Sequence, residues 1–431
     1  MKSILKNALN NNEEKINIIS NNSDLINKNR CFNKFQLCFK NKVVKSEYKL
    51  KESFFVSNNP SNIQNKKKIR NPGIDIIRLI GMYIIILNHI LFAGKAYKKF
   101  YKYSRQLNIL HILTDWHNNG FSLISGIVGY KTNKYSNLLY LWLIVVFYSV
   151  GIHIFIQIFF KQFIIDTDIS KEFFPIIYRR YSYFTSYFGM YLYLPIINKG
   201  IFCLTKHEFR LVIFSILSIL VLWRDFKNPN QDIFYMNKGY AMIWLLTNYL
   251  TGAYIGKYRE NYSGLKKYIY CLIFIFIYFF SSYLYIKVED NSLYSGKIWI
   301  FTQISLFLRK MLTMRYNSFL KISQSISASL FFLQINYPKI LTKIICFLGP
   351  LSFGIYLIHV HPLIYPNVLS HIFDKVQNSI NFYATIIMIL IKVLRIFVFC
   401  LIIDYFRNLF FSFLKIKKFC IFFEAIINNS S

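Results

Sequence analysis

The chain has 431 residues, of which 55% are hydrophobic and 19% aromatic, and its formal net charge is +33. Several long runs are apolar on every side, without the helical or strand alternation of a soluble fold. This pattern excludes an ordinary soluble protein and predicts an all-α, multi-pass transmembrane helical bundle. We attribute the positive charge to loops and tails that face anionic lipid rather than to nucleic-acid binding.

The cysteines and histidines give no sign of a metal site. Seven cysteines are scattered along the chain. Cys31 and Cys38 lie near each other, but no partner pair or histidines follow at zinc-ligand spacing. We therefore predict neither disulfides nor a bound metal.

The chain divides into three parts by composition. Residues 1–70 are rich in Asn and Lys and lack an apolar core, so we expect a disordered tail rather than a signal peptide or a span. Basic residues just before the first span predict that this tail is cytosolic. Residues 71–406 are the predicted transmembrane domain, and 407–431 are a short C-terminal tail.

About ten or eleven spans are predicted from the apolar runs. If the tail is cytosolic and each span changes the side of the membrane, the basic loop 95–117 lies outside. This loop does not follow the positive-inside tendency, so the predicted orientation rests on the tail alone. No long soluble segment separates the spans, so the chemistry falls to membrane helices and short loops. The candidate spans are 74–94, 119–130, 138–160, 181–203, 210–223, 240–256, 268–287, 298–313, 322–337, 344–365 and 383–406.

The first candidate span carries Arg78 and His89 within its apolar run. Eleven steps of about 100° make roughly three turns, so both side chains lie on one helix face, about 16 Å apart along the axis. Ionisable groups inside a span are costly and usually serve a function. His89 is a candidate base, and the alternative is a histidine bonded to a neighbouring helix for packing. Arg78 suits a carboxylate or phosphate, or pairs with Asp75 one turn earlier.

Three later segments hold further candidates. Ser125 and Gly126 favour close helix packing over catalysis, and no Ser-His-acid triad can be assembled. His359 either lines the same cavity as His89 or packs in the core; His361, two residues later, is not at metal-ligand spacing. Tyr187 and Tyr191 share a helix face, which suits sugar or acyl-carrier stacking but is more typical of aromatic packing. The candidates in these segments are Ser125, Tyr187, Tyr191 and His359.

These features resemble the acyltransferase-3 family of integral membrane O-acyltransferases, of the type that modifies polysaccharides. Arg-x(10)-His in the first span is similar to the signature of that family, and further segments follow in the family's order over residues 71–406. These segments are NNGFSLISGIVG, LLYLWLIVVFYSV, YFTSYFGMYLYLPIINKGI, YAMIWLLTNYLTGAYIGKY and LSFGIYLIHVHPLI.

The resemblance implies transfer of an acyl group, usually acetyl, from acyl-CoA to a hydroxyl of a carbohydrate or other glycan-like acceptor. Acyl-CoA is then a co-substrate, and no permanently bound cofactor is expected. His89 matches the essential histidine, acting as base or acyl relay, and Arg78 matches the arginine that holds the donor. His359 matches a late-span histidine with a supporting role. The protein is expected in the plasma membrane or an endomembrane, in contact with membrane lipid.

One position departs from the family pattern. Many members carry Arg-x-x-Arg shortly after the Ser-Gly segment, but here the nearest cations are Lys131 and Lys134. Lysines engage phosphates as point charges without the bidentate geometry of arginine. The details of donor binding therefore differ from the pattern.

Other classes of protein remain as alternatives. The main one is a multi-pass transporter of a small solute, because polar residues in spans also line solute pathways. It predicts inverted repeats and broken helices, which the sequence does not display. A non-catalytic protein of this fold, or a membrane acyltransferase with a single late histidine, leaves Arg78 and His89 as a pair unexplained.

Overall fold

The computed structural model describes residues 71–132, 134–163, 168–223, 234–259, 264–289, 316–376 and 381–429. All the regular elements in these ranges are helices, which confirms the all-α prediction. The predicted tail 1–70 and the predicted span 298–313 lie outside the described residues. Apart from Phe202–Leu204, the described residues belong to one unit, Arg70–Ile201 with Thr205–Ser431.

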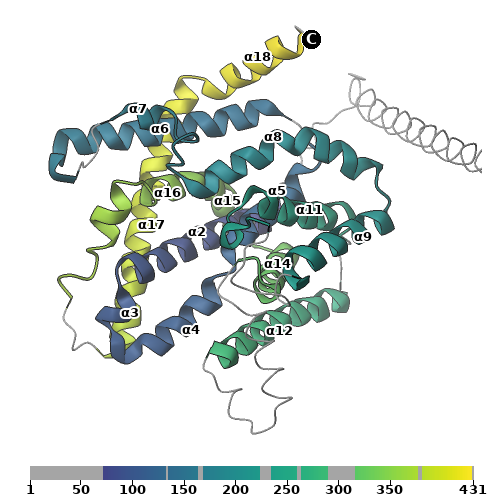
Figure 1. The fold of residues 1–431 in the computed structure, drawn as a ribbon, viewed down its shortest axis with the longest axis horizontal. Helices are drawn as coiled ribbons and strands as arrows, with labels where there is room; N and C mark the ends of the chain where they lie inside the picture. The colour runs from purple at the N-terminus through teal and green to yellow at the C-terminus, as the bar shows by residue number, and fades with distance from the viewer. Residues whose placement is uncertain are drawn as a thin grey trace, which may run out of the picture. The chain divides into compact units, whose positions relative to one another are not determined.

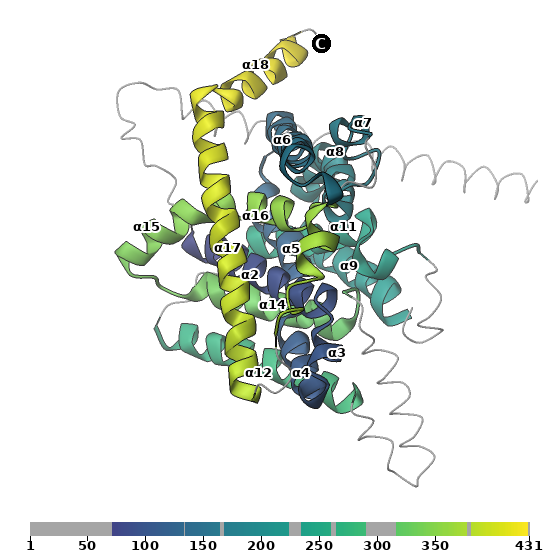
Figure 2. The ribbon, with the colours of Figure 1, turned by 90° about the vertical axis from the view of Figure 1, so that its left-hand side faces the viewer.

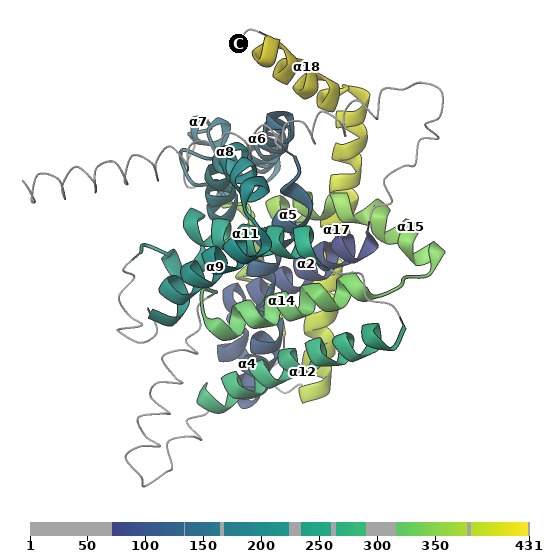
Figure 3. The ribbon, with the colours of Figure 1, turned by 90° about the vertical axis from the view of Figure 1, so that its right-hand side faces the viewer.

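Helices α12 and α14 lie side by side (Figures 1 and 3). The longer elements are α2 (Pro72–Ala93), α4 (Ser104–Thr114), α5 (His117–Gly129), α6 (Tyr135–Phe159), α8 (Ser182–Cys203), α9 (Lys206–Leu217), α11 (Met242–Tyr258), α12 (Gly264–Glu289), α14 (Phe319–Gln334), α15 (Lys339–Leu348), α16 (Ser352–His359), α17 (Phe382–Phe413) and α18 (Ile416–Asn429). The short ones are α3 (Ala96–Lys99), α7 (Ser170–Phe173), η1 (Tyr101–Tyr103), η2 (Lys161–Phe163), η3 (Ser218–Trp223), η4 (Asn237–Gly239), η5 (Gly349–Leu351) and η6 (Tyr365–Leu369).

Four described helices are long and apolar enough to cross a membrane: α2, α6, the continuous stretch Lys339–His359, and α17. They coincide with four of the predicted spans. The other predicted spans in the described part fall on α5, α8, α9 with η3, α11, α12 and α14. These helices are shorter or less apolar than the four, and their crossing of the membrane stays a prediction.

Helix α17 shows why the fold belongs in a membrane. Its most apolar window has a mean hydropathy of 2.9, yet only 17% of that window is buried in the protein. Large side chains such as Phe399, Phe406 and Phe413 point outward along it. Such a continuous apolar surface is unfavourable in water and is the expected surface of a helix that faces lipid hydrocarbon. Figure 2 shows this helix running past α16 and α2.

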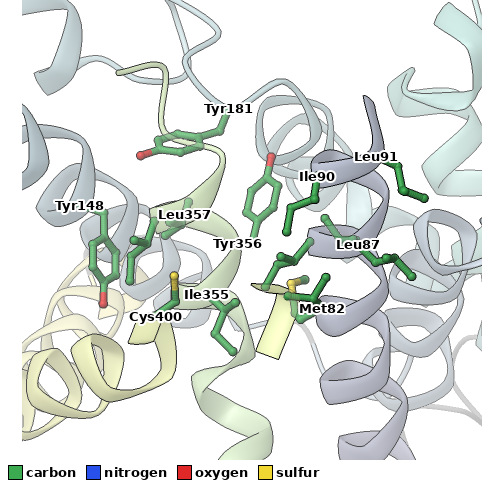
Figure 4. Packing of buried hydrophobic residues seen from close by; sticks show 14 of the residues in the cluster. Met82, Leu87, Ile90, Leu91, Tyr148, Tyr181, Ile355, Tyr356, Leu357 and Cys400 are labelled. Atoms are coloured by element: carbon green, nitrogen blue, oxygen red, sulfur yellow. The ribbon is translucent and has the colours of Figure 1, made fainter. Parts of the chain in front are cut away.

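The largest buried cluster lies where α2, α6, α16 and α17 meet. Ile86 and Ile90 of α2 are completely buried, and Ile355 and Leu357 of α16 are equally inaccessible. Figure 4 shows α16 residues between the α2 side chains and Tyr148 of α6. This packing holds α2 between its neighbours and fixes the direction of its polar face.

Helices α5 and α11 cross at close range because glycines occupy the crossing point. A Cβ at Gly126 would collide with the carbonyl oxygen of Tyr249, and one at Gly252 would collide with that of Leu123. Small residues allow membrane helices to approach in this way. Gly126 therefore has the packing role that its sequence context favoured.

Helix α17 continues beyond the predicted end of the last span at residue 406, and the predicted tail 407–431 contains helix α18. Asp404 and Arg407, which lie near this boundary, neutralise each other. Arg407 donates from Nε and Nη2 to the two carboxylate oxygens of Asp404, at 2.9 and 2.7 Å, and Tyr148 donates to Asp404 at 2.7 Å. A buried pair with satisfied hydrogen bonds can stay inside a helix bundle.

We predict that Gly252→Ala destabilises the protein, whereas Gly151→Ala does not. The methyl group at residue 252 must displace backbone, which costs about 1–3 kcal/mol. Gly151 lies inside α6 with open space where its Cβ would stand, so it is a matched control. The thermal unfolding midpoint of the purified full chain in detergent, followed by tryptophan fluorescence, measures both. Equal midpoints for the two variants would contradict the close crossing.

Candidate active site

The start of α2 is specified locally. Asn71 caps the helix, its side-chain oxygen accepting from the backbone N–H of Gly73 at 2.8 Å, and Pro72 occupies the first turn. Asp75 also lies in the first turn, where a negative charge is favourable. These residues fix where the helix begins, and thereby which face carries Arg78 and His89.

A cavity of about 750 Å³ opens against that face. Arg78 and His89 both line it, as their spacing in the sequence predicts. Residues of α5, α8, the α15–α16 region and the segments around Tyr240 and Tyr316 complete the walls. The structure thus brings the two ionisable residues of the first span to one enclosed space.

His89 contacts a second histidine from a distant part of the chain. The distance from its Nδ1 to Nε2 of His359 is 3.2 Å, and the ring centroids are 5.2 Å apart. His359 is fully buried, and its Nδ1 lies 2.6 Å from the carbonyl oxygen of Ile355, one turn earlier in α16. His359 therefore lies behind His89 rather than in the cavity wall.

The carbonyl of Ile355 decides the protonation of both rings. A carbonyl oxygen only accepts, so Nδ1 of His359 carries the hydrogen and Nε2 of His359 has a lone pair. That lone pair accepts the hydrogen of Nδ1 of His89, which leaves Nε2 of His89 unprotonated in the neutral ring. The relay thus turns the basic nitrogen of His89 away from His359 and makes it available to a ligand in the cavity.

Arg78 pairs locally and lines the cavity at the same time. Its Nη1 donates to Oδ1 of the fully buried Asp75 at 3.0 Å, while the side chain keeps 27% of its surface exposed. Tyr187 lies within electrostatic range of Arg78 and donates to Oγ of Ser125 at 3.4 Å. Ser125 donates in turn to the carbonyl of Phe121 on its own helix. Arg78, Tyr187 and Ser125 form one region of the cavity wall.

The remaining predicted residues lie outside the cavity wall. Lys131 and Lys134 are exposed in the turn after α5 and are not among its lining residues. Tyr191 donates to the carbonyl of Lys134 at 3.3 Å, and its ring centroid is 6.1 Å from that of Tyr187. Tyr191 and Tyr187 therefore lie between the backbone of Lys134 and the region of the cavity that contains Arg78.

Sequence reasoning missed a polar wall around His117. Nδ1 of His117 lies 3.0 Å from the carbonyl of Thr114, so it is the protonated nitrogen, and the side chain lines the cavity. Asn118 donates to the hydroxyl of Tyr240 at 3.2 Å, and both line the cavity. His117 precedes the Ser-Gly segment and nothing in its spacing marks it as functional, whereas Asn118 opens the family segment NNGFSLISGIVG without a sign of its contact with Tyr240.

Arg180 was also missed. It lines the cavity and forms an ion pair with Glu172, a carboxylate that is completely buried. The chain has 52 lysines and arginines, so the sequence alone gives no reason to treat Arg179 and Arg180 as more than surface charges. Only the buried partner, eight residues earlier, distinguishes Arg180.

Among the described residues, no group of three or more His, Cys, Asp or Glu is arranged to hold a metal ion.

The family profile of acyltransferase-3, described as an acyltransferase domain, matches residues 71–405. The chain is a member of this acyltransferase family. No curated protein and no solved structure is found to match the chain. The match spans α2 to α17 and includes every helix that contributes Arg78, His89 and His359. It does not favour the alternative of a solute transporter.

The cavity combines a nitrogen base, a guanidinium and apolar walls, which suit the chemistry of acyl transfer. A hydroxyl is a poor nucleophile until a base accepts its proton, and His89 presents an unprotonated nitrogen. Walls built largely from aromatic and aliphatic side chains keep the site poor in water, which protects a reactive acyl donor from hydrolysis.

We predict that diethyl pyrocarbonate modifies His89 and leaves His359 unmodified in the folded protein. The reagent acylates an accessible unprotonated imidazole nitrogen, which His89 offers and the buried His359 does not. Exposed His207 serves as the positive control for reactivity. Peptide mass spectrometry after brief treatment measures each site, and modification of His359 ahead of His89 would contradict the assigned tautomers.

Proposed function

We propose that this acyltransferase transfers an acyl group, in the first place acetyl, from acyl-CoA to a hydroxyl of a carbohydrate or other glycan-like acceptor. The observation that carries the proposal is the pairing, in one cavity, of a base with a free nitrogen and a guanidinium about 16 Å away along the same helix. The proposal includes a multi-pass arrangement in the plasma membrane or an endomembrane, with the N-terminus in the cytosol.

The reaction proceeds by proton transfer and addition. Nε2 of His89 takes the proton of the acceptor hydroxyl as the oxygen attacks the thioester carbonyl carbon. The carbon–sulfur bond then breaks, the acyl group stays on the acceptor oxygen, and the CoA sulfur leaves and receives the proton from His89. His359 holds the Nδ1–H of His89 throughout and stabilises the transient imidazolium by accepting its hydrogen bond.

Arg78 and the two lysines suit the charged part of the donor. CoA carries several phosphates at one end and its thioester at the other, joined by the extended pantetheine arm. A thioester at His89 directs that arm along α2 toward Arg78, whose guanidinium binds phosphate well. Lys131 and Lys134 lie outside the cavity beyond Tyr191, where the outer phosphates would meet them as point charges.

The opposite wall has the composition of a sugar subsite. Tyr183, Tyr240, Tyr316 and Tyr365 line the cavity together with Asn118. Aromatic faces stack on sugar rings, and tyrosine hydroxyls and amides exchange hydrogen bonds with their hydroxyls. Asn119 positions this wall, because its Nδ2 donates to the carbonyl of Tyr316 at 2.7 Å and its Oδ1 accepts from Trp244 at 2.8 Å.

We predict that His89→Ala lowers acyl transfer at least about 100-fold, the lower range for loss of a general base. Membranes containing wild type, the variant or no enzyme are given labelled acetyl-CoA, and label is counted in glycan and lipid fractions. His207→Ala, a surface histidine, is the control. If His89→Ala labels as strongly as wild type and above the empty membranes, the acyltransferase activity stands but His89 is not its base. Longer acyl-CoAs are assayed in parallel, since the acyl chain is part of the proposal.

We predict that Arg78→Gln raises KM for acyl-CoA by about 10- to 100-fold, because a hydrogen bond to a charged phosphate contributes roughly 1.5–3 kcal/mol. The variant also leaves the buried Asp75 without its cation, so the thermal unfolding midpoint is measured alongside KM. Arg78→Lys is expected to recover part of the loss, as lysine keeps the charge without the fork. An unchanged KM with a lowered kcat would place Arg78 elsewhere in the mechanism.

A further inference from the structure

Arg180 is held more firmly than a surface arginine. Its Nε donates to Oε2 of Glu172 at 3.1 Å, and its Nη2 contacts Oε1 of the same carboxylate. Ser149 also donates to Oε2, and Nδ1 of His153 lies 3.4 Å from Oε1. Glu172, Ser149 and His153 are all buried, so the carboxylate is fixed by α6 on one side and by Arg180 on the other. A guanidinium bound along one edge to such a carboxylate has a defined orientation.

Arg180 lines the cavity, and Glu172 leaves the other edge of its guanidinium uncovered. Arginine has five N–H donors in a planar fork, and Glu172 takes only the edge formed by Nε and Nη2. Among the described residues, no hydrogen bond joins Nη1 of Arg180 to another group, and the side chain keeps 19% of its surface exposed. Because Arg180 lines the cavity, its end-on edge offers two parallel donors to whatever occupies that space.

Arg180 belongs to the His89 end of the cavity rather than to the Arg78 end. Nε2 of His361 lies 3.3 Å from the carbonyl of Ser149, beside Glu172. His361 follows two residues after His359, which bonds His89. Arg78 is about 16 Å from His89 along α2. Helix α8 begins at Ser182, next to Arg180, and reaches Tyr187 on the Arg78 side, which gives the same order.

We infer that Arg180 binds an anionic group on the acceptor, so that the acceptor is an acidic sugar carrying a carboxylate or a phosphate. This inference rests on the proposed function for the identity of the acceptor, which occupies the side of His89 away from the donor phosphates. Glu172 compensates Arg180 while the cavity is empty, which avoids an unpaired cation in a water-poor space. The free edge then accepts a carboxylate or phosphate through charge-assisted hydrogen bonds.

Three probes with the same ring test the inference by binding alone. Methyl glucoside is neutral, methyl glucuronide replaces its hydroxymethyl group with a carboxylate, and methyl glucoside 6-phosphate carries a phosphate there. Binding to the purified full chain in lipid nanodiscs is measured by saturation-transfer NMR with titration. We expect the wild type to bind at least one anionic probe about tenfold more tightly than the neutral one, as charged hydrogen bonds allow. The tighter anion identifies the group as carboxylate or phosphate.

The variants separate binding from folding. Arg180→Gln removes the cation, and the double variant with Glu172→Gln removes both buried charges together, so that no carboxylate is left uncompensated. Both are expected to lose the preference for anions and to keep the wild-type KM for acetyl-CoA. Arg179→Gln is the matched control, because it removes the neighbouring exposed charge and is expected to keep the preference.

The outcomes distinguish this inference from the proposed function. Equal binding of all three probes by the wild type overturns the anion site, and so does a preference that survives in both Arg180 variants. If the Arg180 variants raise the KM for acetyl-CoA and keep the preference for anionic probes, Arg180 binds the donor instead of the acceptor. An anionic probe that binds through Arg180 but is never acetylated leaves the anion site established and refutes the proposed transfer to glycans.

Discussion

The hydrogen bond between His89 and His359 connects the chemistry of the cavity to the packing of the bundle. It joins α2 to α16, two helices far apart in sequence that share the largest apolar cluster. Because His359 is itself held by the carbonyl of Ile355, the packing of α16 sets the protonated nitrogen of His89.

Buried ion pairs are the second constraint, and in three of them an arginine contacts a completely buried carboxylate. The pairs Asp75–Arg78 and Asp404–Arg407 are each three residues apart on one helix, while Glu172–Arg180 joins a short helix to the segment before α8. Each carboxylate is completely buried, which is tolerated because it is bonded to a guanidinium. In two of the three pairs the arginine also lines the cavity. The few acidic residues of this chain thus position its cations.

Glycine has a related role in the family motifs. Gly354, in the late Ser-x-Gly segment, leaves room for the carboxylate of Asp404, since a Cβ there would collide with it. Gly349 similarly accommodates Asp75. Both glycines bring backbone against a charged pair on another helix, so they act on the site indirectly. The motifs therefore combine residues of the cavity with residues that let helices approach.

Much of this protein was predictable from local pattern. Long apolar runs identify helices and a membrane, and the spacing of Arg78 and His89 places them on one face, because both follow from the helix period alone. The order of the short motifs also indicated the family, and the match of the family profile to residues 71–405 confirms it. The predicted spans 74–94, 138–160, 344–365 and 383–406 coincide with the four long apolar helices.

Only the tertiary structure decided which distant groups meet. Three features depend on how the helices pack: the contact of His359 with His89, the cavity wall around His117, and the pairing of Arg180 with Glu172. The sequence contains no periodic pattern that predicts how helices pack. The pairing of Asp404 with Arg407 inside α17 also depends on the three-dimensional structure, because it is stabilised by Tyr148 from another helix. Local periodicity determined the helices and their polar faces; burial and partner choice, which are non-local, determined the site.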